Sequence, residues 1–191
     1  GATNTAVGQA ALAANTTAAY NTAMGASALA ANTTGANNAA FGNDAMKANT
    51  TGIQNVSVGD GALDANTTGH YNVALGKSAL GANTTADNNT AVGMSALAAN
   101  TTGDVNVAIG RSALAANTTA SNNIAIGKDA LLANTTGNTN IAIGTDAMTT
   151  NVAGDRNVAI GEQALQNLNP SGNVDTLNTA VGYNAMLATT T

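Results

Sequence analysis

The sequence predicts an all-β protein, a parallel β-solenoid (β-roll or β-helix) of eleven coils with 17 residues in each coil. An apolar residue followed by glycine recurs every 17 residues, Trp is absent and aromatic residues are rare, and the residues before each glycine alternate in character with period two. A unit this short cannot bury an apolar face alone, so it gains stability by stacking on its own copies. We therefore treat residues 1–191 as a single repeat domain.

The recurring glycine defines the repeat, and we number each coil from it as position 0. The first nine intervals are 17 residues and the last is 21, because four residues are inserted near 169–175, where we expect a surface loop. The central glycines, which we expect at a turn, are Gly8, Gly25, Gly42, Gly59, Gly76, Gly93, Gly110, Gly127, Gly144, Gly161 and Gly182.

An asparagine occupies position −4 in every coil. We expect these side chains either to hydrogen-bond from coil to coil as a ladder or to cap turns, and both roles are structural. The residues are Asn4, Asn21, Asn38, Asn55, Asn72, Asn89, Asn106, Asn123, Asn140, Asn157 and Asn178.

Each coil is expected to contain two strands joined by two turns. The segment Asn-Thr-Ala-Val-Gly alternates small or polar with larger apolar residues, which is typical of a strand. Ala-Leu-x-Ala-Asn, from position +3 to +7, predicts a weaker second strand. A helical repeat is disfavoured, because glycine, asparagine and threonine all lower helix stability and a helix pair needs a longer unit.

The fifteen charged residues mark the outward positions, because burying an unpaired charge costs several kcal/mol. All fall at position +1, +2, +5, +11 or +12 or in the insertion, and none falls between −4 and −1. These residues are Asp44, Lys47, Asp60, Asp64, Lys77, Asp87, Asp104, Arg111, Lys128, Asp129, Asp146, Asp155, Arg156, Glu162 and Asp175.

Both faces of the strand before the glycine are thus uncharged. We expect the aliphatic residues at −3 and −1 to be shut away from solvent inside the coil. The opposite face, with asparagine, alanine and glycine at −4, −2 and 0, is then predicted to be covered by another copy of the chain, which makes the protein a homo-oligomer.

Two families of repeats are similar to this one. Asn-Val-Ala-Ile-Gly-x-x-Ala-Leu, at 106–114 and 157–165, resembles the head repeats of trimeric autotransporter adhesins. The longer pattern, at 4–17 and 89–103, resembles the Asn-Thr-Ala-Val-Gly…Asn-Thr-Thr-Gly arrays of phage tail fibre and spike proteins. The resemblance implies a left-handed homotrimer and a structural or adhesive rod for host attachment, at the virion surface or outside the cell, with a cell-surface receptor or glycan as partner.

Catalytic or metal-binding chemistry is not expected. His70 is the single histidine and cysteine is absent, so we expect His70 to be a solvated turn residue, with no catalytic residue, no cofactor and no metal site. The aspartates that share position +2 or +11 lack a calcium-binding signature, and we expect them to lie in solvated turns. The mild formal charge of −5 argues against nucleic acid as a partner, and no apolar run is long enough to enter a membrane as a helix.

Three further expectations concern the turn and the ends. Asn-Thr-Thr occurs eight times and is formally a glycosylation acceptor, but we expect a turn. The same threonine rows make ice binding an alternative function. Because the chain opens on Gly1 and stops within a repeat, we also expect a processed segment or, as another alternative, a self-assembling extracellular filament whose copies stack end to end.

Overall fold

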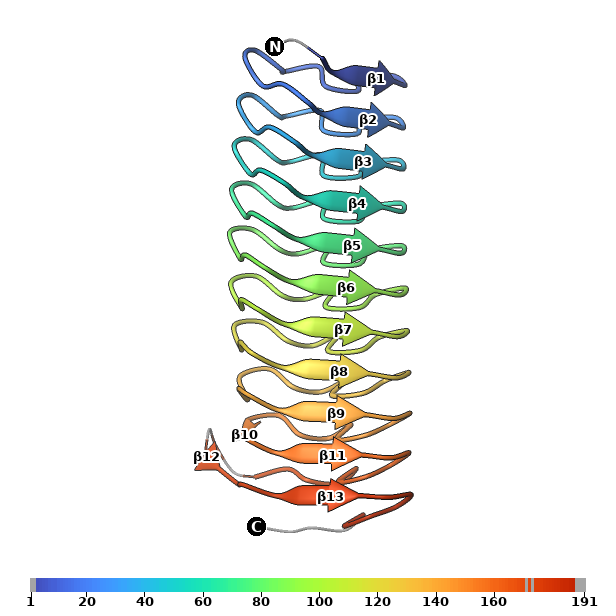
Figure 1. Cartoon of the computed structure of the whole chain (residues 1–191), viewed down its shortest axis with the longest axis vertical. Coiled ribbons are helices and arrows are strands. Elements are labelled where there is room, and N and C mark those ends of the chain that lie inside the picture. Colours follow the sequence, from blue (N-terminus) through green and yellow to red (C-terminus); the bar gives the residue numbers. More distant parts are fainter. Residues whose placement is uncertain (1–2, 171, 173, 188–191) are drawn as a thin grey trace.

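The computed structural model describes residues 3–170, 172 and 174–187 and confirms the all-β parallel solenoid. Eleven parallel strands form one long sheet along the rod, with each strand beside its equivalent in the next coil (Figure 1). Its strands are β1 (Thr5–Val7), β2 (Thr22–Met24), β3 (Ala39–Phe41), β4 (Val56–Val58), β5 (Val73–Leu75), β6 (Thr90–Val92), β7 (Val107–Ile109), β8 (Ile124–Ile126), β9 (Ile141–Ile143), β11 (Val158–Ile160) and β13 (Thr179–Val181).

The 17-residue period sets the register of this sheet without exception. Each alanine at −2 pairs with the −2 residue of the next coil, so that Ala108 lies beside Ala125. Backbone hydrogen bonds continue on both sides of the strands, from Thr5 N–H to the Asn21 carbonyl (2.9 Å) and from Gly25 N–H to the Val7 carbonyl (2.8 Å). Coil stacking therefore involves more of the backbone than the three-residue strands alone.

The predicted second strand is absent from the described coils, which have tight turns from +1 to +6 instead. In the first coil, Ala11 N–H donates to the Gly8 carbonyl and Asn15 N–H donates to the Leu12 carbonyl. Residues at +2 and +4 take left-handed backbone angles, as in Ser112 (φ 58°) and Leu114 (φ 52°). An extended strand is incompatible with alternate residues at positive φ, so this part of the prediction was wrong.

The two faces of the strand are reversed relative to the prediction. The alanines at −2 and +3 and the leucine or methionine at +4 form the hydrophobic core, together with the asparagines at −4. Ala108, Ala113 and Leu114 have no exposed surface, whereas Ile109 at −1 is 39% exposed. The expectations that the aliphatic face lies inside and that the Asn/Ala/Gly face meets another chain were therefore wrong.

The narrow coil explains this reversal. Its interior is filled by side chains from the strand on one side and from the turn at +3 and +4 on the other. Protein interiors are close-packed, so the strand can place only small side chains there. The larger Val, Ile, Leu, Met and Phe side chains at −1 are left on the outside.

The insertion lies in the last complete coil. A second, two-stranded parallel sheet pairs β10 (Gly154–Asp155) with β12 (Val174–Asp175). Leu168 is fully buried and Pro170 is buried, and they occupy the two places after the turn at which other coils have asparagine and threonine. Residues 171 and 173 of the expected surface loop lie outside the described part of the chain, whereas Gly172 and Val174 are exposed.

Candidate functional site: the outer face of the long sheet

The surface most suited to interaction is the outward side of the eleven-stranded sheet, which we call the outer face. It consists of the residues at −3 and −1 of every coil, and none of these is charged. At −3 they are Thr5, Thr22, Ala39, Val56, Val73, Thr90, Val107, Ile124, Ile141, Val158 and Thr179. At −1 they are Val7, Met24, Phe41, Val58, Leu75, Val92, Ile109, Ile126, Ile143, Ile160 and Val181.

Side chains of the outer face cover one another only in part. Val58 is 40% exposed, Phe41 37% and Ile160 39%, although each stacks on an apolar neighbour in the adjacent coil. The strand is flat and regular, so these side chains form two continuous columns along the rod. An uninterrupted apolar surface of this kind is unusual on a monomer and typical of an interface.

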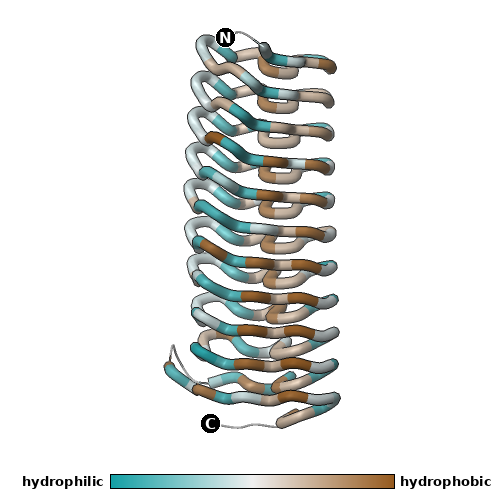
Figure 2. Tube along the Cα trace, viewed as in Figure 1, coloured by the Kyte–Doolittle hydropathy of each residue, from teal (hydrophilic) through white to brown (hydrophobic). Residues whose placement is uncertain are grey.

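The apolar character of the outer face increases toward its C-terminal half. β1, β2 and β3 carry threonine or alanine at −3, whereas β7, β8, β9 and β11 carry only valine and isoleucine at both positions. Figure 2 shows this change as paired brown segments along the lower strands. The strongest apolar patch therefore covers β7 to β11.

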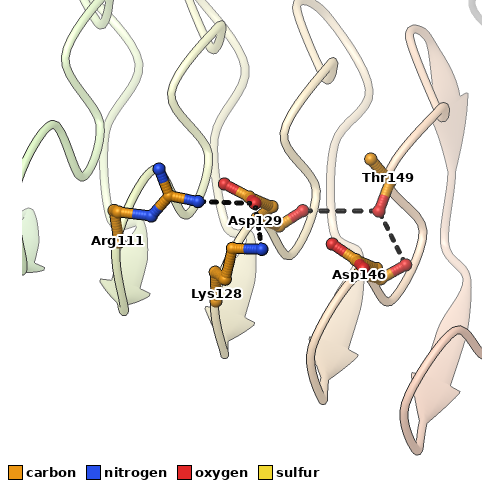
Figure 3. Close-up of polar contacts among 5 residues, drawn as sticks. All are labelled: Arg111, Lys128, Asp129, Asp146 and Thr149. Atoms are coloured by element: carbon orange, nitrogen blue, oxygen red, sulfur yellow. Dashed lines mark hydrogen bonds and ion pairs between the residues drawn. The ribbon is translucent and has the colours of Figure 1, made fainter.

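Position +1 forms one rim of the outer face and carries most of the nearby charge. At the β7 and β8 coils, Arg111 and Lys128 both place a nitrogen 3.3 Å from the carboxylate of Asp129 at +2 (Figure 3). Thr149 Oγ1 donates to the carbonyl of Asp146 at 2.6 Å and lies 3.5 Å from that of Asp129. These ion pairs are largely exposed, so they add little stability but set the charge of this rim.

Position −5, which is also +12 of the preceding coil, forms the opposite rim. Its side chains are exposed in the described coils and include Tyr20, Tyr71 and Val105. Val105 has φ 59°, an unfavourable angle for a β-branched residue, and the other residues at −5 share this left-handed angle. Arg156 is the one charged residue in the column, and it forms an ion pair with Asp175.

The predicted asparagine column at −4 supports the face from inside. Asn106 Oδ1 accepts the backbone N–H of Asn123 in the next coil at 3.0 Å, and Asn106 Nδ2 donates to the Ala120 carbonyl at 2.9 Å. Each amide thus joins two coils and also holds its own turn, so the ladder and the turn-capping roles are combined. Buried polar groups require such partners.

A second asparagine column, at +7, was not predicted as a structural ladder. Asn100 Nδ2 donates to Asn83 Oδ1 at 3.1 Å, and Asn117 Nδ2 donates to Asn100 Oδ1 at 2.9 Å. These are the asparagines of the Asn-Thr-Thr motifs, and all of them beyond Asn15 are fully buried. The folded coil therefore hides these amides from a glycosylating enzyme, and the recurrence of Asn at +7 was the signal that the sequence offered.

The threonine rows lie at a corner of the coil, away from the outer face. Thr101 at +8 donates its hydroxyl to the Thr118 carbonyl at 3.0 Å, whereas Thr102 at +9 is exposed. One row of hydroxyls is therefore used between coils and one row faces solvent. Ice binding stays a prediction, which a thermal-hysteresis measurement tests.

Position +11 holds side chains that accept hydrogen bonds from the preceding coil. His70 Nδ1 accepts the Ile53 N–H at 3.0 Å, Asp87 Oδ1 accepts the His70 N–H at 2.6 Å, and Asp104 Oδ1 accepts the Asp87 N–H at 2.7 Å. The same pattern extends to Asp155, which accepts from Asn138. His70 is thus a half-buried turn residue with a structural hydrogen bond, and not simply a solvated one.

Two aspartates of one coil have pKa values shifted in opposite directions. Hydrogen bonds from Asn43 and Lys77, together with the charge of Lys77, lower the pKa of Asp60 below its ordinary 3.8. Burial is the main cause that raises the pKa of Asp64 above 3.8, with Asp44 acting in the same direction and Lys47 against it. Asp64 is therefore the carboxylate that the fold accommodates less well.

All fifteen charged side chains are at least partly exposed, as their positions in the repeat predict. Within the residues that the structure describes, no group of three or more His, Asp or Glu side chains is placed to hold a metal ion. The described part of the chain also contains no helix suited to crossing a bilayer.

Comparisons with known proteins do not identify a relative. No protein-family model, no curated protein and no solved structure matches this chain. The case for a function therefore depends on the geometry of the outer face.

Proposed function

We propose that this chain is a non-enzymatic structural or adhesive rod, whose copies associate side by side through the outer face. The observation that supports it is the exposed, uncharged double column of aliphatic side chains along the sheet, with Ile109 and Ile160 each 39% exposed. Removing such side chains from water contributes about 25 cal/mol for each Å² of apolar surface. The natural occupant is a second copy, because its identical coil spacing matches the columns over their whole length.

The size of the face is sufficient for a stable interface. Eleven rungs at ~4.8 Å give a length of about 50 Å, and the strand with its two rims is about 20 Å wide. The resulting area of roughly 1,000 Å² for each copy exceeds the ~800 Å² that a partner buries in a standard interface. A left-handed homotrimer is the form implied by the resemblance to adhesin and tail-fibre repeats, and that resemblance also favours attachment outside the cell or on a virion as the role of the rod.

Sedimentation velocity of the purified chain tests self-association. We expect a discrete oligomer for the wild type and a monomer for Ile126→Lys, since residue 126 points outward and its replacement places a charge in the interface. Thr119→Lys is the matched control, because residue 119 is exposed at the threonine corner, and this variant is expected to keep the oligomer.

Three outcomes oppose the proposal or redirect it. A wild-type monomer at tens of micromolar contradicts association through the outer face. An Ile126→Lys variant that remains oligomeric shows that another surface is used. Fibres of indefinite length in electron micrographs favour the end-to-end filament instead, and the adhesive role requires saturable binding to a cell or glycan.

A further inference from the structure

The two rims of the outer face determine how a second copy is oriented. The +1 rim carries Asp60, Lys77, Arg111, Lys128 and Glu162, whereas the −5 rim carries only Arg156. Arg156 and Glu162 flank the same strand, β11, on opposite sides. No described ion pair includes Glu162, whereas Arg156 pairs with Asp175 of its own chain.

Two symmetric ways of covering the face are distinguished by these rims. A symmetry axis along the rod gives parallel copies, in which the +1 rim of one chain meets the −5 rim of the other at the same strand. A two-fold axis across the rod gives antiparallel copies, in which +1 meets +1 and the order of the strands is reversed.

The parallel arrangement matches charge and shape at every rung. Glu162 of one copy faces Arg156 of the other, and no rung brings like charges together. Lys77 faces Tyr71, and Arg111 faces Val105. The valine and isoleucine strands β7 to β11 then pack on their own equivalents, which concentrates apolar contact in one place.

The antiparallel arrangement is less favourable when the faces overlap fully. Centred on β6, it places Lys77 opposite Arg111 at two symmetric sites, although Asp60 then faces Lys128. It also packs the aliphatic strands β9 and β11 on β3 and β2, which carry Ala39 and Thr22 at −3. Like charges at a rim act against association.

We propose that the second copy lies parallel and in register, with Glu162 of each chain facing Arg156 of a neighbouring chain. This inference rests on the proposed association through the outer face and adds its direction and register. The same geometry holds for two or three copies around an axis along the rod.

Chemical cross-linking tests this orientation, because the chain contains no cysteine. The parallel reporter is the double variant Asn122→Cys with Lys128→Cys, whose thiols lie on opposite rims of β8. Facing sheets are ~10 Å apart, so a thiol reagent spanning about 10 Å joins two copies. Six residues of extended chain separate the thiols by roughly 20 Å within one copy, which is too far for that reagent.

The antiparallel reporter is Asp60→Cys with Lys128→Cys, which lie opposite each other only when the strand order is reversed. We expect covalent dimers or trimers from the parallel reporter and at most one tenth of that yield from the antiparallel reporter. Cross-linking of the antiparallel reporter, or of neither reporter in a protein that sediments as an oligomer, overturns the orientation but leaves self-association intact. A monomer in sedimentation instead refutes the association itself.

Charge reversal tests the register. We expect Glu162→Arg to weaken association about tenfold, and we expect the exchange Arg156→Glu with Glu162→Arg to restore it to within about threefold. A double variant as weak as Glu162→Arg alone contradicts the pairing of these two side chains.

Discussion

A methyl group at position 0 is too large for this coil. At Gly93 an added Cβ lies 2.5 Å from the Gly110 carbonyl oxygen, and φ is 133°, an angle that side chains disfavour. We expect Gly93→Ala to lower the free energy of unfolding by at least about 2–3 kcal/mol, measured by denaturant unfolding followed by circular dichroism.

Gly61 is the matched control, because its added Cβ meets only Ser78 Oγ at 3.9 Å and other coils carry Ala10 or Ser27 at this position. Gly61→Ala is expected to change the free energy of unfolding by less than about 1 kcal/mol, since the left-handed angle opposes the loss of entropy in the unfolded chain. Equal effects of the two substitutions would contradict the close approach of coils at position 0.

The two shifted aspartates give opposite dependences of stability on pH. The folded-state pKa of Asp64 is raised, so its ionised form lowers stability above that pKa, and the loss disappears as the pH falls toward 3.8. The folded-state pKa of Asp60 is lowered, so its ionised form contributes stability above 3.8 that is lost as the pH falls through the folded value.

Neutral replacements should reveal this difference in thermal unfolding at a series of pH values. Asp64→Asn is expected to raise Tm at pH 7, with a gain that shrinks as the pH approaches 3.8. Asp60→Asn is expected to lower Tm slightly at pH 7, because it loses the interactions with Lys77. Shifts of the same sign at pH 7 contradict the assignment.

The asparagine columns hold neighbouring coils together, so their members are not equivalent to surface asparagines. Asn100→Ala removes donors to Asn83 and to the Gly103 carbonyl and leaves Asn117 Nδ2 without its acceptor in the next coil. We expect a loss of about 2–4 kcal/mol in the free energy of unfolding and faster amide exchange in the two coils flanking the substitution.

Asn43→Ala is the control for this ladder, because residue 43 is exposed and its amide bonds only to Asp44 and Asp60 at the surface. Its effect on the free energy of unfolding should stay below about 0.5 kcal/mol. A loss as small as this at Asn100 would show that the ladder contributes little.

The strand of each coil could be predicted from the sequence, but the direction of its faces could not be predicted from charge alone. Absence of charge is shared by the buried alanine column at −2 and the exposed aliphatic column at −1. Size variation separates them. Position −2 is always alanine except for Ser57, whereas −1 ranges from Val7 to Phe41, and a close-packed interior does not tolerate such variation from coil to coil.

The segment from +1 to +6 was predicted less well, for a backbone reason. Leu12 and its equivalents at +4 have the side chains of a strand but take φ near 50°, an angle that leucine rarely adopts. Stacking of identical turns provides the compensation, since Leu29 N–H donates to the Ala45 carbonyl in the next coil. Such angles arise from contacts between coils, which local sequence preference does not report.

At the scale of the whole rod, stability is a sum over coils and the contacts between neighbouring coils. Deleting residues 89–105 removes one complete coil and joins Asn88 to Asn106, which restores every column. Deleting only the eight residues 94–101 leaves a coil of nine residues, too short to go around the core. The smaller deletion is therefore expected to be the more damaging one.

Thermal unfolding followed by circular dichroism measures this contrast. We expect the 17-residue deletion to keep the β-sheet spectrum and to lower Tm by less than about 5 °C, since it removes one coil and one coil-to-coil contact. The eight-residue deletion should lower Tm by more than about 10 °C, equivalent to several kcal/mol in a chain of this size, or split the transition in two, because the coils on either side lose their shared register. If the eight-residue deletion is tolerated as well as the 17-residue one, coils do not need to close individually and the additive description of the rod is wrong.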